Sequence, residues 1–264
     1  MLALAAGVAV VLLRDGGDDE TQARRDAVAA YIVEVNQTQQ KLIVQLESIN
    51  RAYRELDLKG DPTPAELDRV DGVERTLKQL RSRFTALDVP AEARKLHRQL
   101  LRLVDLQAAF AHEMAAMVRF LPIQAREQRT LTEATVKLRR ALIEKATVAT
   151  QGAAFDEYRT TLRAVVLRLE QAEAPPVLEP ARTGEIARLT RVGFLAKELA
   201  EALRKQQADR IDRLSRQFVQ TSGTTGATRA ERDAVIAFNR RRTAIGKQRA
   251  AVNAERNRVD LKLR

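Results

Sequence analysis

The stretch VAAYIVEVNQTQQKLIVQLESINRAYREL, residues 28–56, carries an apolar residue at every seventh position: Val28, Val35, Leu42, Ile49 and Leu56. An α-helix completes two turns in about seven residues, so this spacing holds one stripe of the helix against a neighbouring helix over its whole length. A second register of the same kind runs through Leu96, Leu103, Phe110 and Met117. The sequence therefore predicts long helices that pack side by side.

The composition supports a helical fold. Hydrophobic residues make up 45% of the 264 residues, but there is no Trp, and Tyr and Phe number only three and seven. Small and unbranched apolar residues suit thin seams between helices, and the sequence has no alternating β-branched runs joined by tight turns. We predict an all-α fold: an elongated antiparallel bundle of long heptad-patterned helices behind a short N-terminal apolar segment.

The chain has no cysteine. Disulfides, thiolate metal ligands, cysteine nucleophiles and a lipid-modified cysteine are therefore excluded, while the cellular compartment stays open.

Residues 1–13 are apolar or small throughout, and the acidic, glycine-containing linker RDGGDDE follows at 14–20. Thirteen helical residues span about 20 Å, less than the roughly 30 Å of a bilayer core. A secretory signal and a buried core helix are alternatives, but a membrane anchor whose start lies upstream fits best. Arg14, Arg24 and Arg25 would favour a cytoplasmic body if nothing preceded residue 1. We nevertheless expect the body to face outward, as in most bacterial proteins with such an anchor.

Prolines and capping residues divide the rest of the chain. The first helix should run from about residue 20 to 58, and Thr63-Pro64-Ala65-Glu66 is typical of a capping box that starts the second. The third helix should begin after Pro90 and end or kink at Pro122. We expect a first helical hairpin region at 21–122, a second at 123–220, a Ser/Thr/Gly loop at 221–227, and a basic C-terminal helix at 228–264 that packs on the bundle.

Within the second region, an unbroken apolar register predicts one helix or two in line, with a kink at Gly152; it comprises Ala134, Ala141, Val148, Phe155, Leu162 and Leu169. The helix after Pro176 should continue to Phe218. The helix–proline–helix pattern around Pro90 recurs around Pro176, and a duplicated helical hairpin would explain the recurrence.

The residues that carry chemistry in other proteins show no catalytic pattern here. His97 and His112 are 15 residues apart on one predicted helix, about 22 Å along its axis, and neither completes the Glu-x-x-His motif of diiron bundles. We expect both to be partly exposed. Carboxylates such as Glu198 and Asp212 alternate with arginines as on solvated faces. The three tyrosines should be seam residues with hydrated hydroxyls. We therefore expect no catalytic, cofactor-binding or metal-binding residues.

The strongest local feature is the charge of the C-terminal helix. Residues 229–264 contain eleven basic and four acidic residues, so they hold +7 of the net charge of +11. Because Arg240, Arg241 and Arg242 together span more than half of the helix circumference, one of them must lie near the seam. A plain solvated face is one interpretation. The other is contact with an anionic surface, for which the candidate residues are Arg240, Arg241, Arg242, Lys247 and Arg249.

These observations predict a non-enzymatic, membrane-anchored helical-bundle protein of the bacterial envelope that acts as a scaffold, tether or ligand-sensing domain. Its expected partners are the membrane, through the N-terminal segment, and a protein or an anionic envelope polymer. The alternative is a cytoplasmic basic helical protein that associates with nucleic acid. The scarcity of aromatic residues in the basic helix disfavours that alternative, since only Phe238 is aromatic there. The sequence does not indicate an oligomeric state.

Overall fold

The computed structural model describes residues 19–55, 60, 62–144, 147–223 and 226–263. Within these residues there are seven α-helices and one short 3₁₀ turn, and no strand, which confirms the predicted all-α class. The helices are α1 (Asp19–Arg54), α2 (Pro64–Thr85), α3 (Arg94–Ile143), α4 (Val148–Gln171), α5 (Glu179–Arg204), α6 (Ala208–Gly223) and α7 (Gly226–Leu263).

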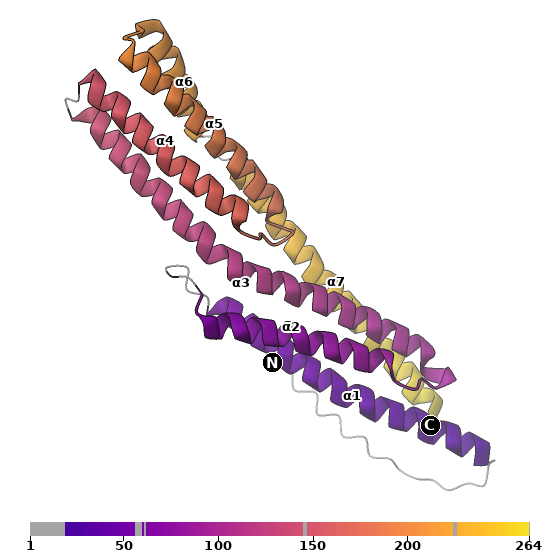
Figure 1. Cartoon of the computed structure of the whole chain (residues 1–264). Helices are drawn as coiled ribbons and strands as arrows, with labels where there is room; N and C mark the ends of the chain where they lie inside the picture. The colour runs from indigo at the N-terminus through magenta and orange to yellow at the C-terminus, as the bar shows by residue number, and fades with distance from the viewer. Residues whose placement is uncertain (1–18, 56–59, 61, 145–146, 224–225, 264) are drawn as a thin grey trace.

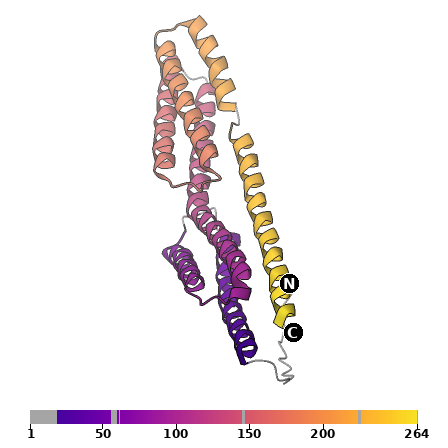
Figure 2. The ribbon, with the colours of Figure 1, turned by 90° about the vertical axis from the view of Figure 1, so that its right-hand side faces the viewer.

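The described helices form an elongated body (Figures 1 and 2). At 50 residues, α3 spans about 75 Å and runs through most of that length. The bundle is therefore elongated, as predicted.

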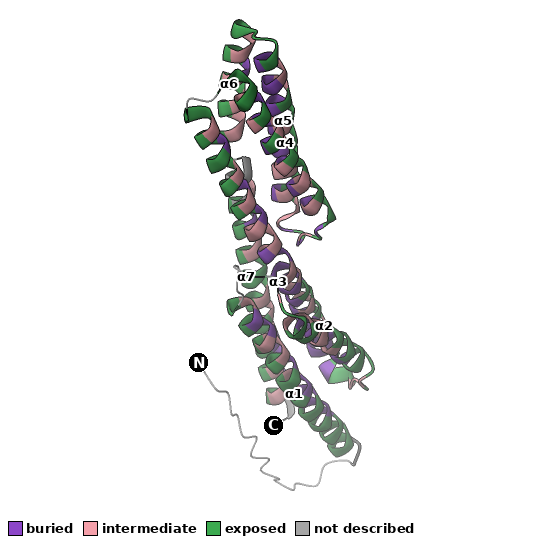
Figure 3. Ribbon diagram, turned by 60° about the vertical axis from the view of Figure 1, so that its left-hand side comes forward, coloured by how far each residue is buried: buried purple, intermediate pink, exposed green. Residues whose placement is uncertain are grey.

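Two apolar cores lie one after the other along α3. The first core joins α1, α2, the N-terminal part of α3 and the C-terminal part of α7, from Val28 to Val259. The second core joins the C-terminal part of α3 to α4, α5 and α6, between Leu131 and Leu214. A small cluster around Met117 connects the two. Figure 3 shows the buried positions as stripes along the helices, with exposed positions on their outer sides.

The heptad stripes of α1 and α3 form the seams of the first core. Leu42 is 3% exposed and Ile49 1%, as the register predicts. Phe110 is only partly buried, and its ring packs against Phe238 of α7 at a centroid distance of 5.0 Å. Thr38 interrupts the stripe, but its hydroxyl donates to the carbonyl oxygen of Glu34 at 2.9 Å and so needs no other partner.

The start of α2 confirms the predicted capping box. The Thr63 backbone N–H donates to a Glu66 carboxylate oxygen at 2.7 Å, and the Glu66 N–H donates to the Thr63 hydroxyl at 3.3 Å. These bonds satisfy amide groups that the first helical turn leaves without a carbonyl partner. Helix α7 begins at Gly226, two residues before the start predicted for the C-terminal helix.

Of the two outcomes predicted at Pro122, an end or a kink of the third helix, the end is wrong. Pro122 is buried inside α3, which continues to Ile143. An interior proline removes one backbone hydrogen bond and costs about 3 kcal/mol. Here the helix packs against other helices on both sides of the proline, and this packing outweighs the local cost.

The prediction of one helix or two in line over residues 134–169 is also wrong. The helix breaks between Glu144 and Thr147, and α4 returns antiparallel along α3, as the contact between the Thr135 and Tyr158 hydroxyls at 3.4 Å shows. Thr147 caps α4 by accepting from the Thr150 N–H at 3.3 Å. Gly152 lies near the start of α4, where a Cβ would be 3.6 Å from the backbone oxygen of Ala200, so the two helices approach closely there.

The helix predicted to run unbroken to Phe218 is instead a hairpin of α5 and α6. Gln206 adopts a φ of 50°. Its N–H donates to the carbonyl oxygen of Leu203 at 2.9 Å, and the Gln207 N–H donates to the carbonyl oxygen of Ala202 at 3.0 Å. This is a Schellman motif, which usually has glycine at the left-handed position. Because Gln occupies it here, the sequence does not signal the end of α5.

None of the described helices has both the length and the apolarity needed to cross a bilayer. Residues 1–13, the predicted anchor, lie outside the described residues, as does most of the linker at 14–20. The membrane anchor therefore stays a prediction.

Candidate functional site: the basic helix α7

Helix α7 lies along α3 through its C-terminal part and beside α5 near its start (Figures 1 and 2). Val252 and Val259 are each 1% exposed, while Phe238 and Ile245 are partly buried. These four apolar residues follow one another at intervals of seven, so α7 contacts the bundle through a narrow seam.

The five candidate residues do not form one patch. Arg241 reaches the buried carboxylate of Glu113 on α3, which confirms that one of the three consecutive arginines lies near the seam. Arg240 and Lys247 are seven residues apart and share one exposed flank of α7, while Arg242 and Arg249 share another. Because successive residues advance by about 100° around a helix, these flanks are about 160° apart, on opposite sides of the seam.

Three buried carboxylates hold the helices together, and the sequence analysis missed all of them. Glu113 and Glu127 are each 1% exposed and Glu255 is 4% exposed. Each is paired with a basic residue of another helix; the cross-helix partners are Arg241, Arg168 and Lys95 respectively. Acids at seam positions of otherwise apolar registers are the only sequence signal that could have indicated them.

Glu255 is the best-paired carboxylate of α7. Lys95 lies 2.9 Å from one of its oxygens, and the Arg258 Nε donates to the other at 2.7 Å. Hydrogen bonds from these two cations stabilise the ionised form and lower the pKa of Glu255 to about 2. The carboxylate is thus charged at neutral pH and fixes the position of α7 on α3.

The histidines lie in different environments. His97 is 9% exposed, and its Nδ1 lies 3.1 Å from the Tyr31 hydroxyl, so the expectation of a partly exposed His97 is wrong. Burial lowers the pKa of His97 and raises that of Tyr31. The Tyr31 hydroxyl is correspondingly shielded, not hydrated as predicted. His112 is exposed, as predicted, with its Nδ1 2.7 Å from Glu74.

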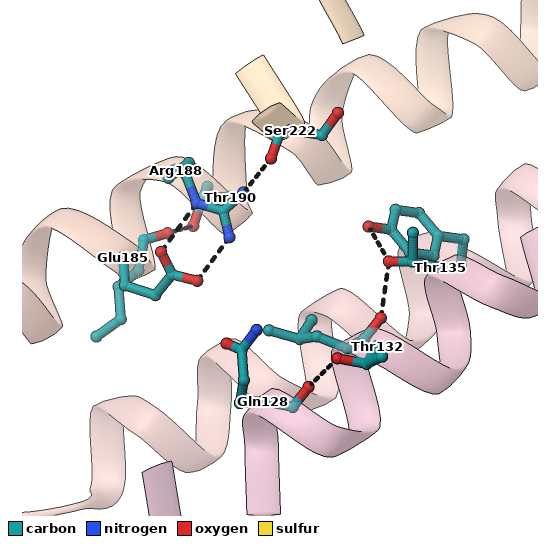
Figure 4. A network of polar contacts seen from close by, with 10 residues as sticks. Gln128, Thr132, Thr135, Glu185, Arg188, Thr190 and Ser222 are labelled. Atoms are coloured by element: carbon teal, nitrogen blue, oxygen red, sulfur yellow. Dashed lines mark hydrogen bonds and ion pairs between the residues drawn. The ribbon is translucent and has the colours of Figure 1, made fainter. Parts of the chain in front are cut away.

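Polar groups in the second core satisfy one another (Figure 4). Arg188 of α5 donates to both carboxylate oxygens of Glu185, at 2.8 and 2.6 Å, and to the backbone oxygen of Ser222 at the end of α6, at 3.1 Å. Glu198, one of the carboxylates expected on a solvated face, pairs with Arg210 of α6. These contacts join α5 to α6 and have a structural explanation.

Within the described part of the chain, no group of three or more His, Asp or Glu residues is placed to hold a metal ion. A shallow depression on α6 is lined by Ser215, Arg216, Val219 and Gln220. It contains no convergent set of polar groups. The basic surface of α7 is therefore the best candidate for a functional site.

The chain matches no protein-family model, and the searches of curated proteins and of solved structures returned no match.

Proposed function

We propose that the chain is a non-enzymatic scaffold or tether of the bacterial envelope, held at a membrane by residues 1–13 with its helical body outside the cytoplasm. The observation that carries the proposal is the in-line arrangement of two cores along one helix of about 75 Å. Such a body separates what is bound at its two ends, which is the mechanical requirement for a tether.

The positions of the helix ends support an attachment at one end. Helix α1 begins and α7 ends beside the first core, whereas the α5–α6 turn lies at the opposite end (Figure 1). A chain anchored before α1 would therefore present the second core away from the bilayer. A ligand-sensing role is a variant of the same proposal, in which the second core binds the partner.

Cell fractionation of the full chain tests the proposal. The protein should sediment with bacterial membranes, resist extraction by high salt and dissolve in detergent. The Val8→Asp/Leu12→Asp variant keeps the length of the segment but puts two charges into it, each costing about 2.5–3.5 kcal/mol in a membrane-spanning helix. It should move to the soluble fraction, whereas the linker variant Asp15→Asn/Asp18→Asn should remain membrane-bound.

Protease added to spheroplasts tests the orientation, because it should digest the helical body if that body lies outside the cytoplasm. A full chain found only in the soluble fraction would overturn the membrane proposal. Recovery of that soluble chain with bound nucleic acid would instead favour the alternative function.

A further inference from the structure

The outer side of α3 carries two arginines beside the Arg240 and Lys247 flank of α7. Arg98 and Arg102 are four residues apart and exposed, so they lie on one face of the helix. Arg102 also follows Lys95 by seven residues, and Lys95 is the α3 residue that reaches Glu255 of α7. Arg98 and Arg102 therefore lie on the exposed side of α3 that borders α7.

Two contacts fix which flank of α7 borders this side of α3. Lys95 reaches Glu255 at 2.9 Å, and the Gln248 side chain donates to the backbone oxygen of Gln99 at 2.9 Å. Lys247 lies next to Gln248, on the same flank of the seam as Glu255. The two helices run antiparallel, so this flank and the Arg98–Arg102 side of α3 face the same way. Arg242 and Arg249 face away from it.

The two arginines of α3 and the two basic residues of the α7 flank form a positive surface whose charge no neighbouring carboxylate among the described residues neutralises. For Arg98, Arg102, Arg240 and Lys247, no described carboxylate lies within ion-pair distance. The carboxylates near them are otherwise engaged: Asp105 pairs with Arg81, and Glu255 pairs with Lys95 and Arg258. Asp233 continues the line of Arg240 by seven residues and marks where the positive surface ends.

We infer that this α3–α7 basic surface, consisting of Arg98, Arg102, Arg240 and Lys247, binds the anionic headgroups of phospholipids. The inference rests on the proposed membrane attachment, because Arg98 directly follows His97, which contacts Tyr31 in the N-terminal half of α1, the helix that follows the proposed anchor. Lys and Arg near an anionic bilayer each contribute about 1 kcal/mol of attraction. Nucleic acid fits less well, since Phe238, the aromatic residue of α7, packs on Phe110 and is not available to stack on bases.

Vesicle binding by the full chain tests the inference. Vesicles of pure phosphatidylcholine report insertion of residues 1–13, which does not need headgroup charge. Equimolar phosphatidylglycerol and phosphatidylcholine vesicles add the contribution of the basic surface. Phosphatidylglycerol should raise the affinity of the unmodified chain for vesicles. In the variant Arg98→Gln/Arg102→Gln/Lys247→Gln this increase should be about a hundredfold smaller, or about fivefold smaller for each charge removed. Its binding to phosphatidylcholine vesicles should not change. The assay therefore distinguishes a failure of the proposed anchor from a failure of the proposed basic surface.

A matched control removes the same charge elsewhere. Arg213→Gln/Arg242→Gln/Arg249→Gln changes three exposed residues. Arg242 and Arg249 lie on the opposite flank of α7 and Arg213 lies on α6, so this variant should remain within about threefold of the unmodified chain. Equal losses in the two triple variants would overturn the inference, since binding would then follow net charge alone. Tighter binding to duplex DNA than to the anionic vesicles would overturn it as well.

A site-specific readout keeps the test informative if residues 1–13 already bind all of the protein to vesicles. The chain has no cysteine, so single cysteines can carry a fluorophore. Ala109 follows Arg102 by seven residues on the same side of α3, whereas Ala250 lies on the solvent side of α7; both are exposed. Headgroup-labelled quencher lipids should quench the dye in Ala109→Cys more than in Ala250→Cys, and only in phosphatidylglycerol vesicles. Equal quenching at both positions would contradict the inference.

Discussion

The buried carboxylate of Glu127 should be the most costly ionic contact to break between α3 and α4. Glu127 is 1% exposed, and Arg168 donates to its two oxygens from Nε at 2.8 Å and from Nη2 at 2.7 Å. Replacing Arg168 with Met keeps an apolar stem but removes both hydrogen bonds. Breaking a fully buried pair costs about 3–5 kcal/mol. Because Arg168 is 41% exposed and Arg126 is a further partner at 3.3 Å, we expect about 2–3 kcal/mol.

Urea unfolding followed by far-UV circular dichroism measures this loss, and hydrogen exchange in α4 localises it. The double variant Glu127→Met/Arg168→Met should recover stability to within about 1 kcal/mol of the unmodified chain, because no charge is then left buried. Lys137→Met is the matched control in the same hairpin. Lys137 and Glu157 form an ion pair in which the side chains are 68% and 58% exposed, and its loss should cost less than about 1 kcal/mol. An Arg168→Met loss no larger than that of Lys137→Met would refute the reasoning.

Four further predictions concern single residues. Leu42→Ala should lower the free energy of unfolding by about 2–5 kcal/mol, whereas Val33→Ala on the exposed side of α1 should change it little, as denaturant titration would show. Gly246→Ala should raise stability by about 1 kcal/mol, since a Cβ there meets no atom within 4 Å; a lower midpoint of unfolding would contradict this. Burial lowers the pKa of His97 below 6.5, so on acidification the unfolded chain binds a proton at this residue before the folded chain does. The free energy of unfolding should therefore fall as the pH drops below 6.5, and in His97→Phe this part of the pH dependence should vanish. The ion pairs of Glu255 stabilise the fold fully above pH 4.5, and this contribution is lost as the pH falls towards about 2. If Glu255→Gln leaves the free energy of unfolding between pH 2 and 4.5 with the same pH dependence, the pairing contributes nothing.

Much of the secondary structure follows from local signals. The heptad registers of α1 and the first half of α3, and the capping box at Thr63, depend on residues within a few turns of each other, so the sequence predicts them correctly. The break after α4 at Pro175 and Pro176 is equally local. Such features need no knowledge of the neighbouring helices.

The two missed reversals show where local reasoning fails. Neither the break before Thr147 nor the turn at Gln206 contains proline or glycine, and the apolar register continues through the first of them. A register describes which face of a helix is buried, and that face stays the same whether the helix continues or folds back. The reverse case is Pro122, where the helix could end or kink by local rules and instead continues, because packing on both sides outweighs the local cost of the proline.

The candidate site divides in the same way. The sequence by itself determined the all-α class, the stripes of the long helices and the excess of positive charge in α7, because these depend on composition and on spacing along one helix. Only the tertiary structure decided that Arg241 meets Glu113, that Lys95 meets Glu255, and that Arg98 and Arg102 lie beside Lys247. These residues are more than a hundred positions apart, so their proximity depends on the antiparallel packing and register of α3 and α7, which no local pattern encodes.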